Sequence, residues 1–561
     1  MLFFSTVNSE DSIDIWKKGN LGEKPTNKIN TLEEKQKKIN ISNQDSISEE
    51  LIQSINLDEP KENLYGIFDP DKNNYSLDMW SRSDGDKIKN AFSRINKIKL
   101  SQSAEDIFIN TILTYSYLPK NMTDDEFLDL KVNWLIKNKK DSLLEEFLNK
   151  NKNFKNKNKI IQYLVDKNIA KANLNEGCRK SEFISKEIKD SYLEKFKIYC
   201  LIFNNKKNEA QLLFDILKEQ NMSDKYFDDK ANFLLGVTNK TNKKVRDDNL
   251  LNFYLSSVTI PNFTYEPNEK TNTFIWEYLN SANLVKFDDV EDKEKLKNLE
   301  FAANKNAFDK EKIFEIYKKF SFDLNSLINA EQIYRSLDDV SARAIIYQKY
   351  LLSDNVENKI KLLLLMEELF KKEKLSNVFA EFMSNKLKEL DEGKIPEDYK
   401  EIVEKNIISE VEYKLGKIKY DDKILHRSRV LRYYTEPDTP VQKTQKDFNS
   451  VYKKIKRNKK YFFSAKDLAL IESLKLDGFN IPKDINDKEL AKNYSIPNSL
   501  LVLLKNREIG LLSLKFVEII GEDEISSLDP ETIYFITNIL NQAKLIKIRN
   551  KTLISSLPLR S

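Results

Sequence analysis

Amphipathic segments, each roughly 12 to 18 residues long, follow one another through short polar turns from about Asp78 to Ser556. A helix with one apolar face must bury that face against a neighbour. Rows of such helix pairs build repeat proteins, in which each unit contacts only the units beside it. The pattern therefore predicts an all-α fold, an elongated α-solenoid of antiparallel helix pairs with tetratricopeptide-like geometry.

Local signals support this interpretation. Thr123 is followed three residues later by Glu126, which is the capping-box pattern of a helix start. Ala210 and Phe214 have the small-then-aromatic spacing of the second helix of a tetratricopeptide repeat, although the remaining consensus positions do not fit. Near the end of the chain, an Asp-Pro-Glu start signal opens the first of two helices over 529–556. We expect this pair to cap the solenoid.

Composition supports the helical prediction only weakly. Only 11 glycines and 13 prolines occur in 561 residues, which is fewer than tight turns and sheets usually need. However, Lys, Asn and Ile are abundant while Gly, Pro, Ala and Arg are scarce. An AT-rich genome produces that bias in any fold, so the prediction rests on periodicity.

Charge is mixed along the whole chain. Lys and Arg number 93 against 89 Asp and Glu, the formal net charge is +4, and the isoelectric point is near 8.4. Dedicated nucleic-acid domains concentrate basic residues on one face and have an isoelectric point above about 9. The interleaved signs indicate solvated helix surfaces, which makes nucleic acid an unfavoured partner. No segment approaches the roughly 18 consecutive apolar residues of a membrane span.

The N-terminus resembles the tail of a secretory signal peptide. Residues 1–9 read MLFFSTVNS, but a basic region and a full apolar stretch are missing. Our hypothesis is that translation starts upstream and that cleavage near Ser9 delivers the protein to the periplasm. The alternative is an ordinary frayed terminus on a cytoplasmic protein. Residues 10–60 are polar and predict a largely disordered leader.

The body of the chain divides by pattern. We expect a first helical-repeat block at 61–236, an irregular insertion or linker at 237–270, a second helical-repeat block at 271–424, an Arg/Tyr/Pro loop with a basic linker at 425–460, and C-terminal helical pairs with the cap at 461–561.

The two cysteines, Cys178 and Cys200, lie late in two successive helical runs. Neither belongs to a CxxC pair or lies near the sole histidine, so we expect no metal site. If the two helices pack side by side, an exported protein would join the cysteines in a disulfide. That bond would contribute about 3 kcal/mol in the chain-entropy model. The alternative is two independently buried thiols.

Two clusters are candidate binding surfaces. The first is the stretch LHRSRVLRYYTEPDTP at 425–440, which contains His426 and the candidate partner-binding residues Arg427, Arg429, Arg432, Tyr433 and Tyr434. Arg and Tyr are favoured at binding hot spots, and three arginines could engage an acidic peptide, a glycan carboxylate or a phosphate. The alternative is a repeat junction whose arginines pair with neighbouring carboxylates. No catalytic partner of His426 is visible nearby in the sequence.

The second cluster, at 452–463, is a run of basic residues flanked by aromatic ones. Such a stretch could bind single-stranded nucleic acid or an anionic membrane surface. Its alternative is a solvated helix end.

Three stretches carry a family resemblance: NLYGIFDPDKNNYSLDMW at 63–80, SLDDVSARAIIYQKYL at 336–351, and the closing pair around Asp529. Through them the chain resembles a family of uncharacterised helical-repeat proteins exported by Gram-negative bacteria. Some members carry the name antifreeze polyprotein, which looks like an artefact of Ala-rich composition. The resemblance spans most of residues 63–556. It implies the fold and export but no catalytic residues.

Motifs for phosphate-loop, dinucleotide, serine-hydrolase and metalloprotease chemistry are missing from the sequence. We therefore predict a non-catalytic interaction scaffold without a cofactor, whose solenoid groove binds protein or cell-envelope material. The alternatives are the solenoid part of a peptidoglycan enzyme and an RNA-binding helical-repeat protein.

Overall fold

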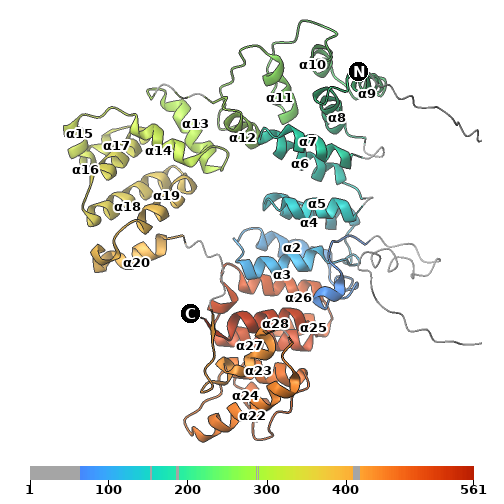
Figure 1. The fold of residues 1–561 in the computed structure, drawn as a ribbon, viewed down its shortest axis with the longest axis vertical. Helices are drawn as coiled ribbons and strands as arrows, with labels where there is room; N and C mark the ends of the chain where they lie inside the picture. Colours follow the sequence, from blue (N-terminus) through green and yellow to red (C-terminus); the bar gives the residue numbers. More distant parts are fainter. Residues whose placement is uncertain are drawn as a thin grey trace, which may run out of the picture. The chain divides into compact units, whose positions relative to one another are not determined.

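The computed structural model of this chain describes residues 64–151, 154–184, 189–285, 287, 290–408, 417–436 and 438–560. Within these residues almost all regular structure is helical, which confirms the predicted all-α class (Figure 1). The predictions for residues 1–9 and 10–60 lie outside the described residues. A two-stranded antiparallel pairing joins β1 (Ile418–Lys419) to β2 (Leu559–Arg560).

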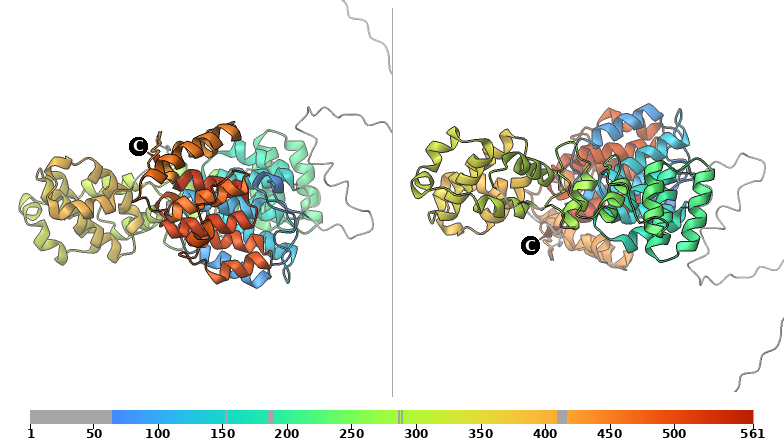
Figure 2. Two further views of the ribbon diagram at one scale, coloured as in Figure 1. Left: turned by 90° about the horizontal axis from the view of Figure 1, so that it is seen from below. Right: turned by 90° about the horizontal axis from the view of Figure 1, so that it is seen from above.

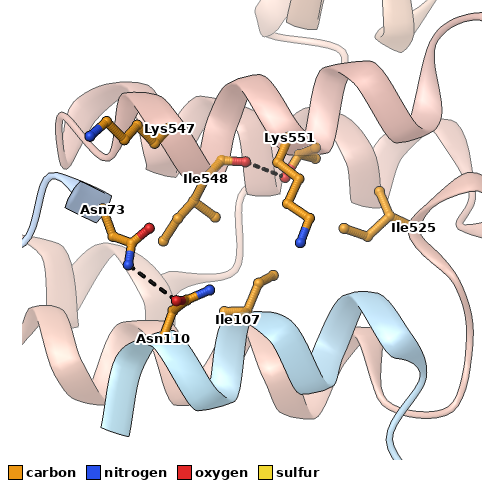
Figure 3. A pocket seen from close by; sticks show the side chains of 8 residues that line it. Asn73, Ile107, Asn110, Ile525, Lys547, Ile548 and Lys551 are labelled. Carbon is orange, nitrogen blue, oxygen red and sulfur yellow. Dashed lines mark hydrogen bonds between the residues drawn. The ribbon is translucent and has the colours of Figure 1, made fainter. Parts of the chain in front are cut away.

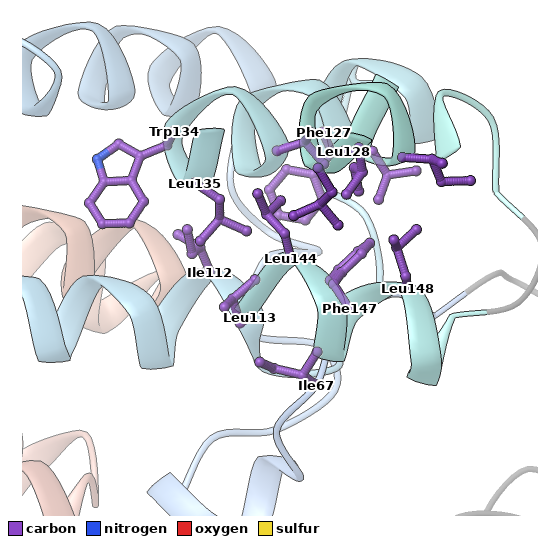
Figure 4. Packing of buried hydrophobic residues seen from close by; sticks show 14 of the residues in the cluster. Ile67, Ile112, Leu113, Phe127, Leu128, Trp134, Leu135, Leu144, Phe147 and Leu148 are labelled. Carbon is purple, nitrogen blue, oxygen red and sulfur yellow. The ribbon is translucent and has the colours of Figure 1, made fainter. Parts of the chain in front are cut away.

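The first of three hydrophobic cores contains the N-terminal helices and the last helices of the chain. Its members are α2 (Gly85–Ile95), α3 (Gln102–Leu113), α4 (Asp124–Lys137), α5 (Asp141–Lys150), α6 (Lys157–Ala170), α7 (Leu174–Lys180), α8 (Ser191–Phe203), α9 (Lys207–Glu219), α10 (Lys225–Leu235), α11 (Leu250–Thr259), α12 (Thr273–Ser281), α25 (Asn498–Lys505), α26 (Ile509–Ile520), α27 (Pro530–Gln542) and α28 (Ile546–Ser556). Figure 4 shows Leu113, Leu135 and Leu144 meeting in this core.

The second core follows along the chain. It is built by α13 (Lys293–Asn304), α14 (Lys310–Lys318), α15 (Leu324–Ile328), α16 (Ala330–Ile333), α17 (Asp339–Leu352), α18 (Val356–Lys372), α19 (Ser376–Lys388) and α20 (Glu397–Asn406).

The third core is built on α21 (Arg432–Thr435), α22 (Val441–Arg457), α23 (Ala465–Leu476) and α24 (Asp487–Ala491), with side chains from α27 and α28. Short 3-10 turns are η1 (Pro70–Asn73), η2 (Ser181–Phe183), η3 (Tyr334–Ser336), η4 (Glu392–Lys394), η5 (Leu425–Arg427), η6 (Arg429–Leu431) and η7 (Ile525–Ser527).

A repeat of 33 residues runs through α4 to α9. Buried positions recur at that spacing in the first helix of each pair, as in Phe127, Ile160 and Leu193 or in Val132, Val165 and Ile198. The second helices carry Leu144, Gly177 and Ala210 at equivalent places, all of them buried. Three helix pairs therefore share one packing register, which is the behaviour expected of a helical repeat.

The turn inside each of these pairs also recurs. Lys139, Ala172 and Asn205 all adopt the left-handed conformation, with φ of 53°, 54° and 60°. Each follows the end of one helix and precedes the next helix by two residues. Glycine usually takes this position. Here non-glycine residues occupy it, which partly explains how so helical a chain contains so few glycines.

The capping box predicted at Thr123 and Glu126 is confirmed, because each side chain accepts a hydrogen bond from the other residue's backbone N–H. Asp529 likewise caps α27 by accepting from the N–H of Glu531 and Thr532, with Pro530 in the first turn.

The final pair, α27 and α28, does not cap a free end as expected. α27 packs on α23 of the third core, and α28 packs on η1. The preceding helix, α26, packs on α2 and α3, and the red and blue helices lie side by side in Figures 1 and 2. The C-terminal helices have apolar side chains on both sides, and burial of both sides against other helices is favourable. This explains the placement of these helices between two cores.

Polar contacts support this closure of the chain on itself. Arg94 donates two hydrogen bonds to one carboxylate oxygen of Glu518, at 3.0 and 2.8 Å. The backbone N–H of Gly510 donates to the carbonyl of Met79 at 2.9 Å. Gly510 lies so close to Trp80 that a β-carbon there would be 2.3 Å from the indole ring.

The two cysteines lie on α7 and α8 and form a disulfide, with their α-carbons 5.4 Å apart. The stretch expected as an irregular insertion at 237–270 contains α11, whose side chains are buried in the first core. Among the described residues, no helix is both long enough and apolar enough to cross a membrane.

Candidate functional site

Within the first candidate cluster, residues 425–435 fold into η5, η6 and α21, which pack against α22 and α23. Leu425, Val430 and Leu431 are buried in the third core, and they hold the segment in place. Ser428 caps η6, because its hydroxyl accepts the N–H of Val430. The segment is therefore a packed part of the fold.

His426 is fixed by a carboxylate from α23. Its Nδ1 lies 2.7 Å from Asp467 Oδ1, and its backbone N–H donates to the same oxygen at 2.9 Å. Burial would raise the pKa of the Asp467 carboxyl, but the hydrogen bonds and charge of His426, with the backbone N–H of Ser464, hold that pKa below its usual value. Asp467 is therefore a charged anchor for the histidine.

Ser464 completes a set of serine, histidine and aspartate, but without the geometry of a catalytic relay. In such a relay the serine and the carboxylate bind opposite ring nitrogens of the histidine. Here Ser464 Oγ lies 3.3 Å from Nδ1, the nitrogen that also faces Asp467. The serine hydroxyl also accepts the N–H of Asp467 as the N-cap of α23. These residues stabilise a helix start and fix a loop.

Two of the candidate arginines pair with neighbouring carboxylates. Arg429 Nε lies 3.1 Å from Asp447, and its Nη2 donates to Ser450 at 3.0 Å. Arg432 Nε lies 3.3 Å from Glu436. This arrangement corresponds to the alternative of a repeat junction rather than to a free binding patch.

Tyr434 faces inward and joins a buried ionic network. Its hydroxyl donates to Asp477 at 2.8 Å, and Arg549 donates to both oxygens of that carboxylate at 2.9 Å. Burial and the charge of Asp477 raise the pKa of Tyr434 well above its ordinary value. Tyr433 packs edge-on against Phe479. Both tyrosines therefore support the fold.

Arg427 differs from its neighbours. No described residue forms an ion pair with it. Burial of Lys466 lowers the pKa of that lysine, and the positive charge of Arg427 lowers it further. Lys466 donates to the carbonyl of Ser556 at 3.1 Å.

The second cluster from the sequence forms an exposed surface at the end of α22. Lys454 and Lys456 are paired with Asp422 and Asp484, at 3.2 and 2.6 Å. Four other basic residues are exposed and form no ion pair with any described residue, and with Phe462 they make up what we term the basic tip: Lys453, Arg457, Lys459, Lys460 and Phe462. Within the stretch 452–463, the basic tip therefore holds the cations that have no ion-pair partner among the described residues.

Phe462 is the most exposed large apolar side chain in the described part of the chain, at 72 %. Its neighbours are held inward. The hydroxyl of Tyr461 donates to Asp467 at 2.9 Å and accepts the N–H of Leu425, while Phe463 packs edge-on against Tyr461. In an extended stretch successive side chains point to opposite sides. The two anchored residues therefore direct Phe462 outward.

A small pocket lies elsewhere, between η1 and α3 on one side and η7 and α28 on the other (Figure 3). Its volume of about 50 Å³ suits a few water molecules. Lys547 beside it donates to the carbonyl of Asp71, and Lys551 pairs with Asp106. The pocket belongs to the closure between the two ends of the chain, and its cations already have partners.

Comparison with known proteins gives no family for this chain: no family model matches it, and no curated protein and no solved structure shows significant similarity to it.

Proposed function

We propose that this protein is a non-catalytic helical interaction scaffold, and that the basic tip is a surface through which it binds an anionic partner of the cell envelope. The observation that carries the proposal is the contrast within the candidate site. His426, Arg429, Arg432 and Tyr434 hold helices together, whereas the cations of the basic tip are exposed and precede an exposed phenylalanine along the chain.

The internal contacts give the basic tip a fixed shape. Asp467 binds both His426 and Tyr461, so one buried carboxylate connects the loop at 425–427 to the turn that carries Phe462. A surface that is already ordered before binding loses less conformational entropy when a partner arrives. In this proposal the sole histidine is a positioning residue for the basic tip.

Envelope localisation is part of the same proposal. The disulfide between Cys178 and Cys200 supports it, since such bonds persist in oxidising compartments such as the periplasm.

Chemical crosslinking in cells of the native host, followed by affinity capture and fractionation, tests the proposal. We expect the intact protein to recover envelope components and the variant Lys459→Gln with Lys460→Gln to lose them. The matched control is Lys443→Gln with Lys446→Gln, which removes the same charge from the exposed start of α22, at the opposite end of that helix from the basic tip. Equal recovery by both variants, or recovery of ribosomal or RNA partners only, would contradict the proposal.

A further inference from the structure

We infer that the partner of the basic tip is an anionic phospholipid surface, with the lysines at the headgroups and the Phe462 ring inserted at the boundary of the acyl chains. This inference rests on the proposed function and names the chemistry of its partner.

Charge is the first argument. Lys453, Arg457, Lys459 and Lys460 lie within eight consecutive positions, and the acidic groups bound nearby, Asp422 and Asp484, are neutralised by other lysines. A basic side chain close to an anionic bilayer strengthens attachment by about fivefold. The attraction falls off within about 10 Å at ordinary ionic strength, so cations grouped at the end of α22 and in the turn after it act together.

The exposed ring is the second argument. Phe462 is 72 % exposed, so the free energy that burial of its ring would contribute is not gained within this protein. The contacts of Tyr461 and Phe463 prevent the ring from turning back onto the protein. At a bilayer surface the ring can leave water, while the long stems of Lys459 and Lys460 lie along apolar matter with their charges at the phosphates. One apolar insertion together with a cluster of cations is the combination that gives stable but reversible attachment.

The same geometry favours lipid over single-stranded nucleic acid. Binding of single strands uses several aromatic faces on which successive bases stack. The rings of Tyr461 and Phe463 pack on each other and are only partly exposed, so Phe462 alone offers an open face. A bilayer needs only one inserting side chain.

Vesicle flotation of the full chain tests the inference. The two vesicle types are phosphatidylcholine alone and equal parts of phosphatidylcholine and phosphatidylglycerol. We expect binding to the mixed vesicles only, with a decrease at high salt. Phe462→Ala should weaken binding about tenfold, and Lys459→Gln with Lys460→Gln about 30-fold.

Two matched variants serve as controls. Lys443→Gln with Lys446→Gln and Leu212→Ala, which removes an exposed apolar side chain from α9, should each bind within about twofold of the intact protein, since neither residue set belongs to the basic tip. Circular dichroism melting verifies that every variant is folded.

Phe462→Trp gives an independent readout. Measured in the Trp16→Phe background, its fluorescence should be quenched by brominated acyl chains in the mixed vesicles. The Trp16→Phe protein with Phe462 intact should show little quenching, because Trp80, Trp134 and Trp276 are buried.

Three results would overturn the inference: equal binding to both vesicle types, equal binding by the test and control variants, or no quenching of Phe462→Trp. If RNA binds with the same dependence on Phe462 while vesicles do not, the lipid inference fails. The proposed function fails separately, if envelope capture in cells does not depend on the basic tip.

Discussion

At the scale of single residues, this fold depends on buried charges that local sequence does not reveal. Arg343, Glu300 and Tyr317 form a fully buried network in the second core, with Arg343 Nη2 at 2.5 Å from Glu300. Lys131 on α4 is 1 % exposed. Its Nζ donates to the carbonyl of Tyr65 at 3.3 Å and lies 4.2 Å from the centre of the Phe127 ring. Each such group requires its neighbours to be correctly placed.

Lys131 should make stability depend on pH. Burial lowers its pKa from 10.5 to about 7. Between these values the unfolded chain holds a proton that the folded chain lacks, so the free energy of unfolding should rise with pH across that window. We expect Lys131→Met to be more stable than the intact protein at and below pH 7, with the difference shrinking toward pH 10.5. Urea denaturation at several pH values measures it, and a difference independent of pH would contradict the assignment.

Removing a buried arginine of the candidate site should cost more stability than removing a partly exposed one. Arg549 is fully buried on Asp477, so Arg549→Ala should cost about 3 to 5 kcal/mol. Arg429 is partly exposed on Asp447, so Arg429→Ala should cost less than about 1 kcal/mol. The denaturant midpoints of the two variants measure these stability losses. Similar losses would show that the buried network is not the stronger support.

The sequence places Tyr434 in a candidate cluster but does not show its role. Its partner Asp477 lies 43 positions away, and Arg549 lies another 72 beyond. In the sequence, an arginine followed by two tyrosines has the composition of a binding surface. Only the fold shows that Asp477 binds Tyr434 in the interior. By contrast, the basic residues of the tip could be recognised from the sequence, because their number exceeds that of the local acids.

At the scale of elements, helix starts could be predicted and the repeat register could not. A helix cap bonds backbone groups only two or three residues away, so the helix starts at Thr123 and Asp529 could be predicted from the sequence. The left-handed turn residue varies among Lys, Ala and Asn, and the buried position of the second helix varies among Leu, Gly and Ala. The three helix pairs share backbone geometry but not residue types, so no repeated motif is visible in the sequence.

The left-handed turn gives a test of the register. Ala172 adopts φ of 54°, a conformation that costs an L-residue with a β-carbon energy that glycine avoids. Ala172→Gly should therefore stabilise the protein by about 0.5 to 1 kcal/mol. Ala170→Gly, two positions earlier at the end of α6, should instead destabilise it. Thermal melting measures both, and the same sign for both would contradict this description of the turn.

At the scale of the whole molecule, the C-terminal helices complete the N-terminal core. This closure brings together residues more than 400 positions apart, such as Tyr75 and Ser513, whose hydroxyls lie 3.1 Å apart. Amphipathic periodicity shows that α27 and α28 have apolar side chains but not which helices cover them. The sequence alone therefore predicts a terminal cap.

Gly510 should be essential to the closure. A β-carbon there would lie 2.3 Å from the fully buried ring of Trp80, so Gly510→Ala should cost about 3 kcal/mol. Gly393, which is exposed and has room for a β-carbon, provides the control: Gly393→Ala should change stability by less than about 0.5 kcal/mol. Hydrogen exchange should also show lost protection in α2 and α3 for Gly510→Ala. Unchanged protection in those helices would argue against the closure.

We propose that this protein meets its partner through the basic tip. The most direct test of this proposal places a photocrosslinking amino acid at position 462, and in a second strain at position 212, and irradiates living cells of the native host. We expect covalent products from position 462 in the envelope fraction and few from position 212. Equal yields from both positions, or products from position 462 found only with cytoplasmic components, would contradict it.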